Sequence, residues 1–204
     1  MRWQIAIGAL LALTASAGFG FAADPRHQDW PCAQAKVPEI SLAAVWAGPP
    51  LDDASDKWKN DARVSALVSK LAARRTPLEE AQQAIKEFLA GAAAEKVTMA
   101  KLLFAGLFDT LNAQRSSVMN GLERVTRKQR EAAEKIRSDT LALQALQDAS
   151  PPDQSRIDEL GNQLVWQTRI FEDRRRVVKF VCEVPVAIDQ RLFALGRMIQ
   201  QEME

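Results

Sequence analysis

Apolar residues recur at alternating spacings of four and three through the second half of the chain. One such run covers 118–146 and a second covers 157–199, and the sequence Ala-Ser-Pro-Pro-Asp at 149–153 separates them. A repeat that averages 3.5 residues places one apolar seam along each helix, and two seams leave water by covering one another. The pattern predicts two antiparallel helices that form a hairpin at about 112–182, with its tip at 149–153.

The register of this hairpin follows from the same pattern. Facing residues in an antiparallel hairpin have numbers that add up to a constant, and seam residues pair well at a constant of 303. The facing pairs are then Val125 with Val178, Ala132 with Phe171, Leu143 with Leu160, and Leu146 with Ile157. Polar Gln129 and Arg174 share one layer, which predicts that they fix the register of the coiled coil.

Shorter helices are predicted before the hairpin. Residues 55–75 carry apolar side chains near one face and charged side chains on the others, as an amphipathic helix does. Thr76, followed by Pro77, is predicted to cap the next helix, and Thr98 to cap the longest one, which continues to Asp148. At the tip, Ser150-Pro151-Pro152-Asp153 is predicted to cap a further helix that has proline at its first position. Pro185 predicts a kink or break in the returning helix.

The segment 23–54 differs from the rest in composition. It holds five prolines and two tryptophans and has no sustained period, so we expect an extended strap with one short helical turn after Ser41. Trp30 and Trp46 either anchor this strap on the helices or form a pair that stacks on a ligand. Cys32 in the strap and Cys182 in the returning helix are the two cysteines, and an oxidising compartment favours a disulfide between them. A reactive thiol pair or a metal site lacks supporting spacing.

The first residues have the pattern of an export signal. Arg2 is followed by an apolar run from Ile5 to Ala17 and by Gly20-Phe21-Ala22, whose small residues suit a signal peptidase. We expect residues 1–22 to be a signal peptide that is cleaved near Ala22, leaving a periplasmic or secreted protein. An uncleaved membrane anchor is the alternative, because the apolar stretch is nearly long enough to span a bilayer.

Patterns that carry catalysis are missing from the sequence. His27 is the single histidine, and the chain has no Gly-x-Ser-x-Gly, glycine-rich phosphate loop or His-Glu-x-x-His. We therefore expect no enzyme, no cofactor and no bound metal. The formal net charge of +1 over 204 residues selects no class of partner by itself.

One local concentration of charge stands out at the middle of the hairpin. The predicted register brings basic residues of the two helices to one level, interleaved with acidic neighbours. Such a band would suit anionic lipid headgroups or an acidic protein, whereas an exported protein is not expected to bind nucleic acid. The band consists of Arg124, Arg127, Lys128, Arg130, Arg174, Arg175, Arg176 and Lys179.

The sequence thus predicts an all-α protein: a helical bundle at 55–204 with a long antiparallel coiled-coil hairpin, preceded by an extended N-terminal strap at 23–54. We expect an exported, non-catalytic interaction or scaffold protein whose hairpin contacts an envelope protein. The alternative is a periplasmic holdase chaperone. A helical hairpin that projects from a base resembles the hairpins of Skp-type periplasmic chaperones, but those proteins also have a β body and share no motif with this sequence. The identity of the partner and the oligomeric state do not follow from the residues.

Overall fold

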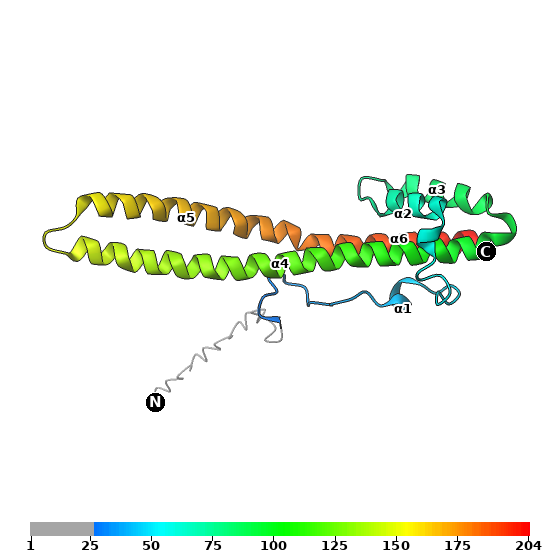
Figure 1. The fold of residues 1–204 in the computed structure, drawn as a ribbon, viewed down its shortest axis with the longest axis horizontal. Coiled ribbons are helices and arrows are strands. Elements are labelled where there is room, and N and C mark those ends of the chain that lie inside the picture. Colours follow the sequence, from blue (N-terminus) through cyan, green and yellow to red (C-terminus); the bar gives the residue numbers. More distant parts are fainter. Residues whose placement is uncertain (1–26) are drawn as a thin grey trace, which may run out of the picture.

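The computed structural model of this chain describes residues 27–204, and within that range every regular element is a helix (Figure 1). The elements are α1 (Leu42–Val45), η2 (Trp58–Asn60), α2 (Ala62–Ala72), α3 (Leu78–Ala90), η3 (Ala93–Glu95), α4 (Lys96–Asp148), α5 (Gln154–Val181) and α6 (Glu183–Met203). The predicted all-α class is confirmed. The predicted signal peptide at 1–22 lies outside the described residues.

The predicted hairpin is confirmed, with α4 as its outgoing helix and α5 as its returning helix (Figure 1). At 1.5 Å per residue, the 53 residues of α4 extend about 80 Å. Along α5 the predicted seam positions are mostly half-buried, while the positions between them are exposed. No residue of α5 is buried, and the buried residues of α4 end at Leu122, so the outer part of the hairpin has a seam but no core of its own.

Two contacts agree with the predicted register. The Gln129 side-chain amide donates to the Phe171 carbonyl oxygen over 3.0 Å, and Arg115 Nε lies 2.8 Å from Asp189 Oδ1. The residue numbers of each pair add up to within three of the predicted constant. The second pair joins α4 to α6, so the same antiparallel register continues from the hairpin into the base of the molecule. The base is the part formed by α2, α3, α6 and the first part of α4.

The returning helix breaks at Cys182, between α5 and α6. Pro185 therefore lies in the first turn of α6, where the backbone N–H that proline lacks would have no partner within the helix. The break predicted at Pro185 is present, but it begins three residues earlier. The backbone at Cys182 keeps helical dihedral angles, φ −60° and ψ −24°, so α6 continues roughly in the direction of α5.

The hydrophobic core lies at the base, where α2 packs on α4 and α3 packs on α6 (Figure 1). Phe104 is the largest of the fully buried side chains, and Trp46 of the strap stacks on it with ring centroids 4.3 Å apart. Trp46 also donates its indole N–H to the Pro49 carbonyl. This tryptophan is a structural anchor. Trp30 donates only locally, to the Gln34 carbonyl.

The predicted strap and disulfide are both present. Between residue 27 and α2 the regular elements are the short helices α1 and η2, and this segment runs along α4 (Figure 1). Cys32 is joined to Cys182, with the two Cα atoms 5.5 Å apart. In the hairpin register Cys182 is level with Gly121, so the strap is tied to the point where the hairpin leaves the base.

Three predicted helix caps were wrong. The Thr76 hydroxyl donates to the carbonyl of Lys70, one of the last residues of α2, over 2.8 Å, and α3 begins at Leu78 without a side-chain cap. Thr98 lies inside α4, which begins at Lys96. At the tip the two prolines precede α5, and the carboxylate of Asp153 accepts from the N–H of Arg156. In the first case the hydroxyl is directed back to a free carbonyl at the end of α2, and no N–H of α3 bonds to its oxygen.

The predicted helix at 55–75 is shorter than expected. Its first part forms the single turn η2, and α2 begins only at Ala62. The Asp61 carboxylate caps α2 by accepting from the backbone N–H groups of Arg63 and Val64, at 2.8 and 3.2 Å. A short polar side chain that satisfies two free donors explains why the helix starts there.

Gly196 allows the strap to approach α6. A Cβ atom at this position would lie 2.5 Å from the Val45 carbonyl oxygen and 2.8 Å from Phe104. A Cβ atom at Gly121, also in a helix, would meet nothing within 4 Å. Close packing therefore requires a glycine at position 196, whereas the helix has room for a side chain at position 121.

We expect Gly196→Ala to lower the free energy of unfolding by about 1–3 kcal/mol, because the added methyl group overpacks a contact with rigid backbone. Gly121→Ala should raise the free energy of unfolding by about 0.5–1 kcal/mol, through the higher helix propensity of alanine. Urea unfolding followed by circular dichroism measures both. Equal effects of the two substitutions would contradict the close approach of α1 to α6.

Reducing the disulfide should lower the free energy of unfolding by about 2–5 kcal/mol, because the bridge closes a very long loop. Urea unfolding of the oxidised protein with and without dithiothreitol measures this loss. The double variant Cys32→Ser with Cys182→Ser serves as the control, because dithiothreitol should not change its stability further. A wild-type protein insensitive to dithiothreitol would contradict a stabilising role of the bridge.

Candidate functional site

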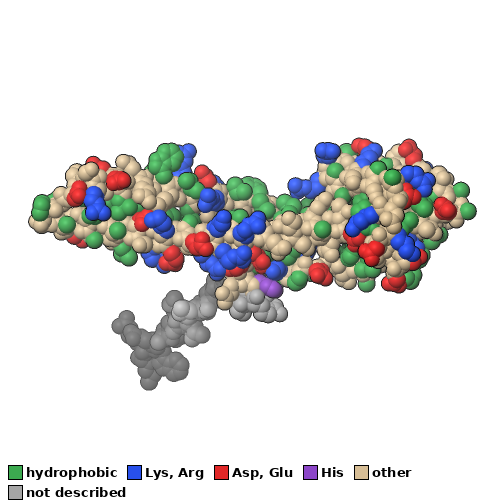
Figure 2. All heavy atoms as spheres, in the orientation of Figure 1, with side chains coloured by type: hydrophobic (Ala, Val, Ile, Leu, Met, Phe, Trp, Pro, Cys, Tyr) green, Lys and Arg blue, Asp and Glu red, His purple; other side chains and the backbone are tan. Residues whose placement is uncertain are grey.

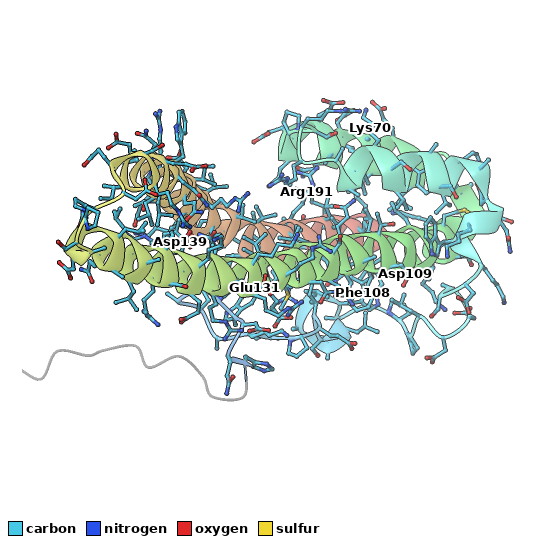
Figure 3. The ribbon with its side chains drawn as sticks, turned by 60° about the vertical axis from the view of Figure 1, so that its left-hand side comes forward. Lys70, Phe108, Asp109, Glu131, Asp139 and Arg191 are labelled. Carbon is cyan, nitrogen blue, oxygen red and sulfur yellow. A yellow bond between two sulfur atoms is a disulfide. The ribbon has the colours of Figure 1, made fainter. Side chains whose placement is uncertain are left out.

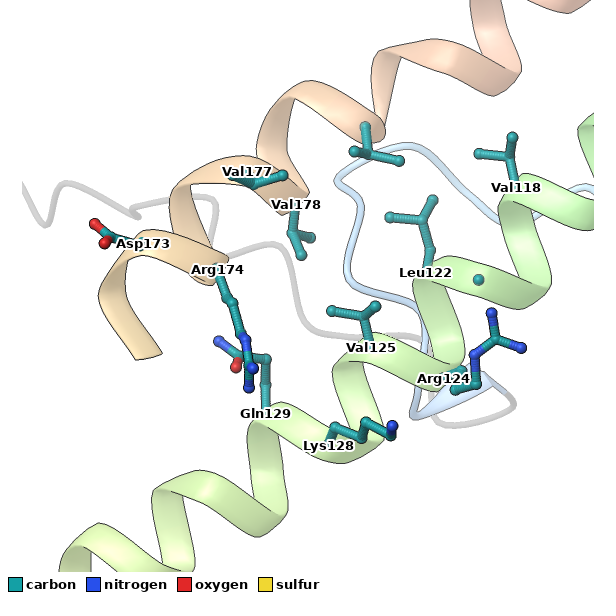
Figure 4. Close-up of a pocket in the computed structure, with 12 residues that line it drawn as sticks. Val118, Leu122, Arg124, Val125, Lys128, Gln129, Asp173, Arg174, Val177 and Val178 are labelled. Carbon is teal, nitrogen blue, oxygen red and sulfur yellow. The ribbon is translucent and has the colours of Figure 1, made fainter. Parts of the chain in front are cut away.

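An open groove lies between α4 and α5, next to the junction with the base (Figure 4). Its volume is about 630 Å³. The lining residues are Val118, Gly121, Leu122, Arg124, Val125, Lys128, Gln129, Asp173, Arg174, Val177, Val178 and Val181. Nearly all of the contributing side chains on the groove floor are aliphatic, so the surface suits an apolar ligand or side chain.

The groove exists because the layers of the hairpin do not close here. Val125 and Val178 were predicted to face each other, and both line the groove, but Val125 remains 36% exposed. Valine side chains are short, and Gly121 has none, so this part of the seam cannot fill the space between the helices. Gln129 bonds to the backbone of Phe171 and leaves Arg174 exposed at the rim, so the predicted polar layer is not a side-chain pair.

Three cationic side chains lie at the rim of this groove. Arg124 and Lys128 come from α4, and Arg174 comes from α5 (Figure 4). Among residues 27–204 none of the three has a carboxylate within ion-pair distance. Asp173, the one acidic residue of the lining, is paired with Arg176. The rim therefore carries positive charge from both helices beside an apolar floor.

The predicted basic band divides into separate groups. Arg127 and Arg130 both pair with Asp29 of the strap, Arg127 over 2.8 Å. Arg175 pairs with Glu172 one turn away over 3.1 Å, Arg176 pairs with Asp173, and Lys179 does not line the groove. Only Arg124, Lys128 and Arg174 are brought together at a concave surface. That the band binds a partner stays a prediction.

The strap and the groove occupy opposite sides of α4. Asp29 of the strap is held by Arg127 and Arg130, whereas Arg124 and Lys128 point to the groove. The hydrogen bond from Arg127 and the positive charge of Arg130 lower the pKa of Asp29 below its usual value. The Asp29 carboxylate is therefore charged at neutral pH and pairs with both arginines. The disulfide and the Asp29 ion pairs thus fix the strap on the side of α4 away from the groove, and the groove stays open to solvent.

Nearer the base, Asp189 pairs with Arg115, whose side chain is only 5% exposed. Burial raises the pKa of Asp189, and the charge of Arg115 opposes this shift. Arg115 also donates to the Pro38 carbonyl oxygen over 3.2 Å. One arginine therefore joins α4, α6 and the strap, which identifies it as a structural residue.

A second cavity of about 250 Å³ continues the groove toward the tip. It is lined by Ala132, Lys135, Ile136, Gln167, Ile170, Phe171 and Arg174. The predicted facing pair Ala132 and Phe171 therefore meets beside open space, not in a closed layer. Arg174 lines both cavities and lies between them, and the two cavities together are called the trough.

Large apolar side chains are exposed along α5 beside this trough. Trp166 is 63% exposed, Val177 57% and Phe180 77%. Figure 2 shows hydrophobic side chains gathered on the surface between the hairpin tip and the globule that contains α2 and α3. The heptad pattern does not predict this exposed apolar surface, although Trp166, Ile170 and Val177 recur at helical spacing outside the seam.

The described part of the chain bears on two other kinds of site, a metal site and a membrane-spanning helix. Residues 27–204 contain no group of three or more His, Cys, Asp or Glu side chains placed to hold a metal ion. None of the helices in this range combines the length and the apolar character that a bilayer crossing requires.

No protein-family model, no curated protein and no solved structure matches this chain.

Proposed function

We propose that this protein is an exported, non-catalytic interaction protein whose helical hairpin contacts an envelope partner. The observation that carries the proposal is α5 itself, a 28-residue helix that buries no residue fully and exposes large apolar side chains. Apolar surface of this kind on a projecting element is typical of a protein-binding surface.

The base supports this role because it is held at several points. Besides the disulfide, Lys36 of the strap pairs with Glu123 of α4 over 2.5 Å, and Arg191 of α6 donates to the carbonyl oxygens of Leu71 and Thr76 at 2.8 and 2.9 Å (Figure 3). The hairpin therefore projects from a fixed platform. A disulfide that stabilises the fold also favours an oxidising compartment, which agrees with export.

A holdase chaperone is the second candidate, and the exposed apolar side chains of α5 favour it. Unfolded envelope proteins offer apolar segments without a defined shape, which Trp166 or Phe180 could hold. A holdase should suppress the aggregation of a denatured outer-membrane protein at near-equimolar ratio. A specific interaction protein should leave that aggregation unchanged.

A photoreactive amino acid at Leu146, near the tip, tests the proposal in the cells that produce the protein. We expect one sharp crosslinked product, because a specific partner presents a single surface to the hairpin. A smear of products would favour the chaperone.

The matched control carries the same photoreactive amino acid at Gln83, which is exposed on α3 of the base. The product should be absent there. Equal crosslinking at Gln83, or none at any hairpin position, would contradict a hairpin that contacts a partner.

A further inference from the structure

The trough between α4 and α5 continues a surface that is already covered by helices at the base. There α2 and α3 pack across α4 and α6, and Val64, Val68 and Leu71 of α2 are fully buried by this contact. Val177 of α5 and Val184, Ile188, Arg191 and Leu195 of α6 follow one another at spacings of seven, four, three and four, which places them near one helix face. Arg191 on this face bonds to the α2–α3 connection.

Beyond the globule the same face has no covering helix in the described part of the chain (Figure 1). Instead Val177 is 57% exposed and Ile170 is 46% exposed. At the base, α2 and α3 cover the pair formed by α4 and α6. Along the hairpin, the pair formed by α4 and α5 is not covered by another helix in the described part of the chain. The ligand that continues this packing is another helix, laid into the groove by its apolar side.

The dimensions of the trough suit such a helix. From Val118 to Ile136 the lining of α4 extends about 27 Å, the length of about 18 helical residues. The trough is open along its length, as a third helix requires. An amphipathic helix would place side chains at spacings of three and four between Gly121 and Val177.

The charge of the rim selects the kind of helix. Arg124 and Lys128 extend from α4, and Arg174 reaches from α5 toward Gln129 at the end of the groove nearer the tip (Figure 4), so a helix with acidic residues on both flanks of its apolar stripe would pair with cations of both helices. A second copy in a symmetric contact would instead bring these cations together with their own equivalents, which is unfavourable.

We infer that the trough binds an acidic amphipathic helix of a partner protein. This inference rests on the proposed function, because it names the surface and the chemistry of the contact that the hairpin makes. Gly121 leaves the space that the apolar side chains of the helix enter, and the three rim cations set its charge.

Two synthetic peptides of about 18 residues provide the probe. Both carry the same leucine stripe and a fluorescein label, and the flanking positions are glutamate in one and lysine in the other. Fluorescence anisotropy with the full, oxidised protein should show that the glutamate peptide binds at least about tenfold more tightly at low salt, and that added salt removes this difference.

Gly121→Leu and Gly161→Leu form a matched pair of variants. A Cβ atom at either glycine meets nothing within 4 Å, so both proteins should fold, but only Gly121 lines the trough. Gly121→Leu should weaken binding of the glutamate peptide by about tenfold or more, and Gly161→Leu should leave it unchanged.

The charge test uses two double variants of equal net charge. Arg124→Glu with Lys128→Glu should reverse the preference, so that the lysine peptide binds more tightly. Arg156→Glu with Lys179→Glu changes two cations that do not line the trough and should preserve the preference for glutamate. A reversal in both double variants would show a long-range charge effect and would overturn the assignment of the rim.

Several other results would overturn the inference that the trough binds an acidic helix. Equal or absent binding of the two peptides overturns the inference, as does flotation with phosphatidylglycerol vesicles that depends on Gly121, or self-association that Gly121→Leu abolishes. Crosslinking from Leu146 in cells that express Gly121→Leu separates this result from the proposed function. If the sharp product at the tip persists while neither peptide binds, the hairpin contacts its partner elsewhere and only the inference fails.

Discussion

The packing of α4 against α6 supports every other part of the molecule. Phe104, Leu107 and Leu111 of α4 and Leu192, Leu195 and Ile199 of α6 are fully buried, whereas α5 has no fully buried residue. Extending a helix from a segment that is already formed costs far less than starting a new one, because nucleation fixes several residues for a single hydrogen bond. The outer half of α4 is therefore helical largely because its inner half is held in the core.

The junction at Cys182 gives the returning helix the same support. Pro185 occupies a position in α6 where a missing N–H has no cost, so the chain can interrupt its hydrogen bonds there without changing direction strongly. Cys32 then ties the strap to this point, and Asp29 is held to α4 by Arg127 and Arg130 just beyond it. Covalent and ionic contacts thus concentrate where apolar burial decreases.

The sequence predicted long-range features better than local ones. The heptad seam, the turn at 149–153, the hairpin register and the Cys32–Cys182 bridge were all predicted, because each depends on a repeat or on the only available pair. The caps at Thr76 and Thr98 were not predicted correctly. A hydroxyl can bond forward or backward along the chain, and its choice depends on which carbonyl or N–H remains free after packing.

The groove could not be predicted from the heptad pattern for a different reason. The pattern assigns Val125 and Val178 to one layer and assumes that the layer closes, yet closure depends on side-chain volume and on the separation of the helices. Gly121 beside three valines of α5 was the available signal. The basic band was recognised as a group, but its division followed from Asp29, whose distance in sequence hides its contacts with α4.

The length of α4 has a mechanical consequence. From Gly121, level with the disulfide, to Asp148 at the tip the helix extends about 40 Å. Because one continuous helix spans both regions, a change of about 5° in its direction at the bridge would displace the tip by about 3.5 Å, close to one residue of an extended strand. Any change in the direction of α4 at the level of the Cys32–Cys182 bond would therefore produce its largest displacement at the tip.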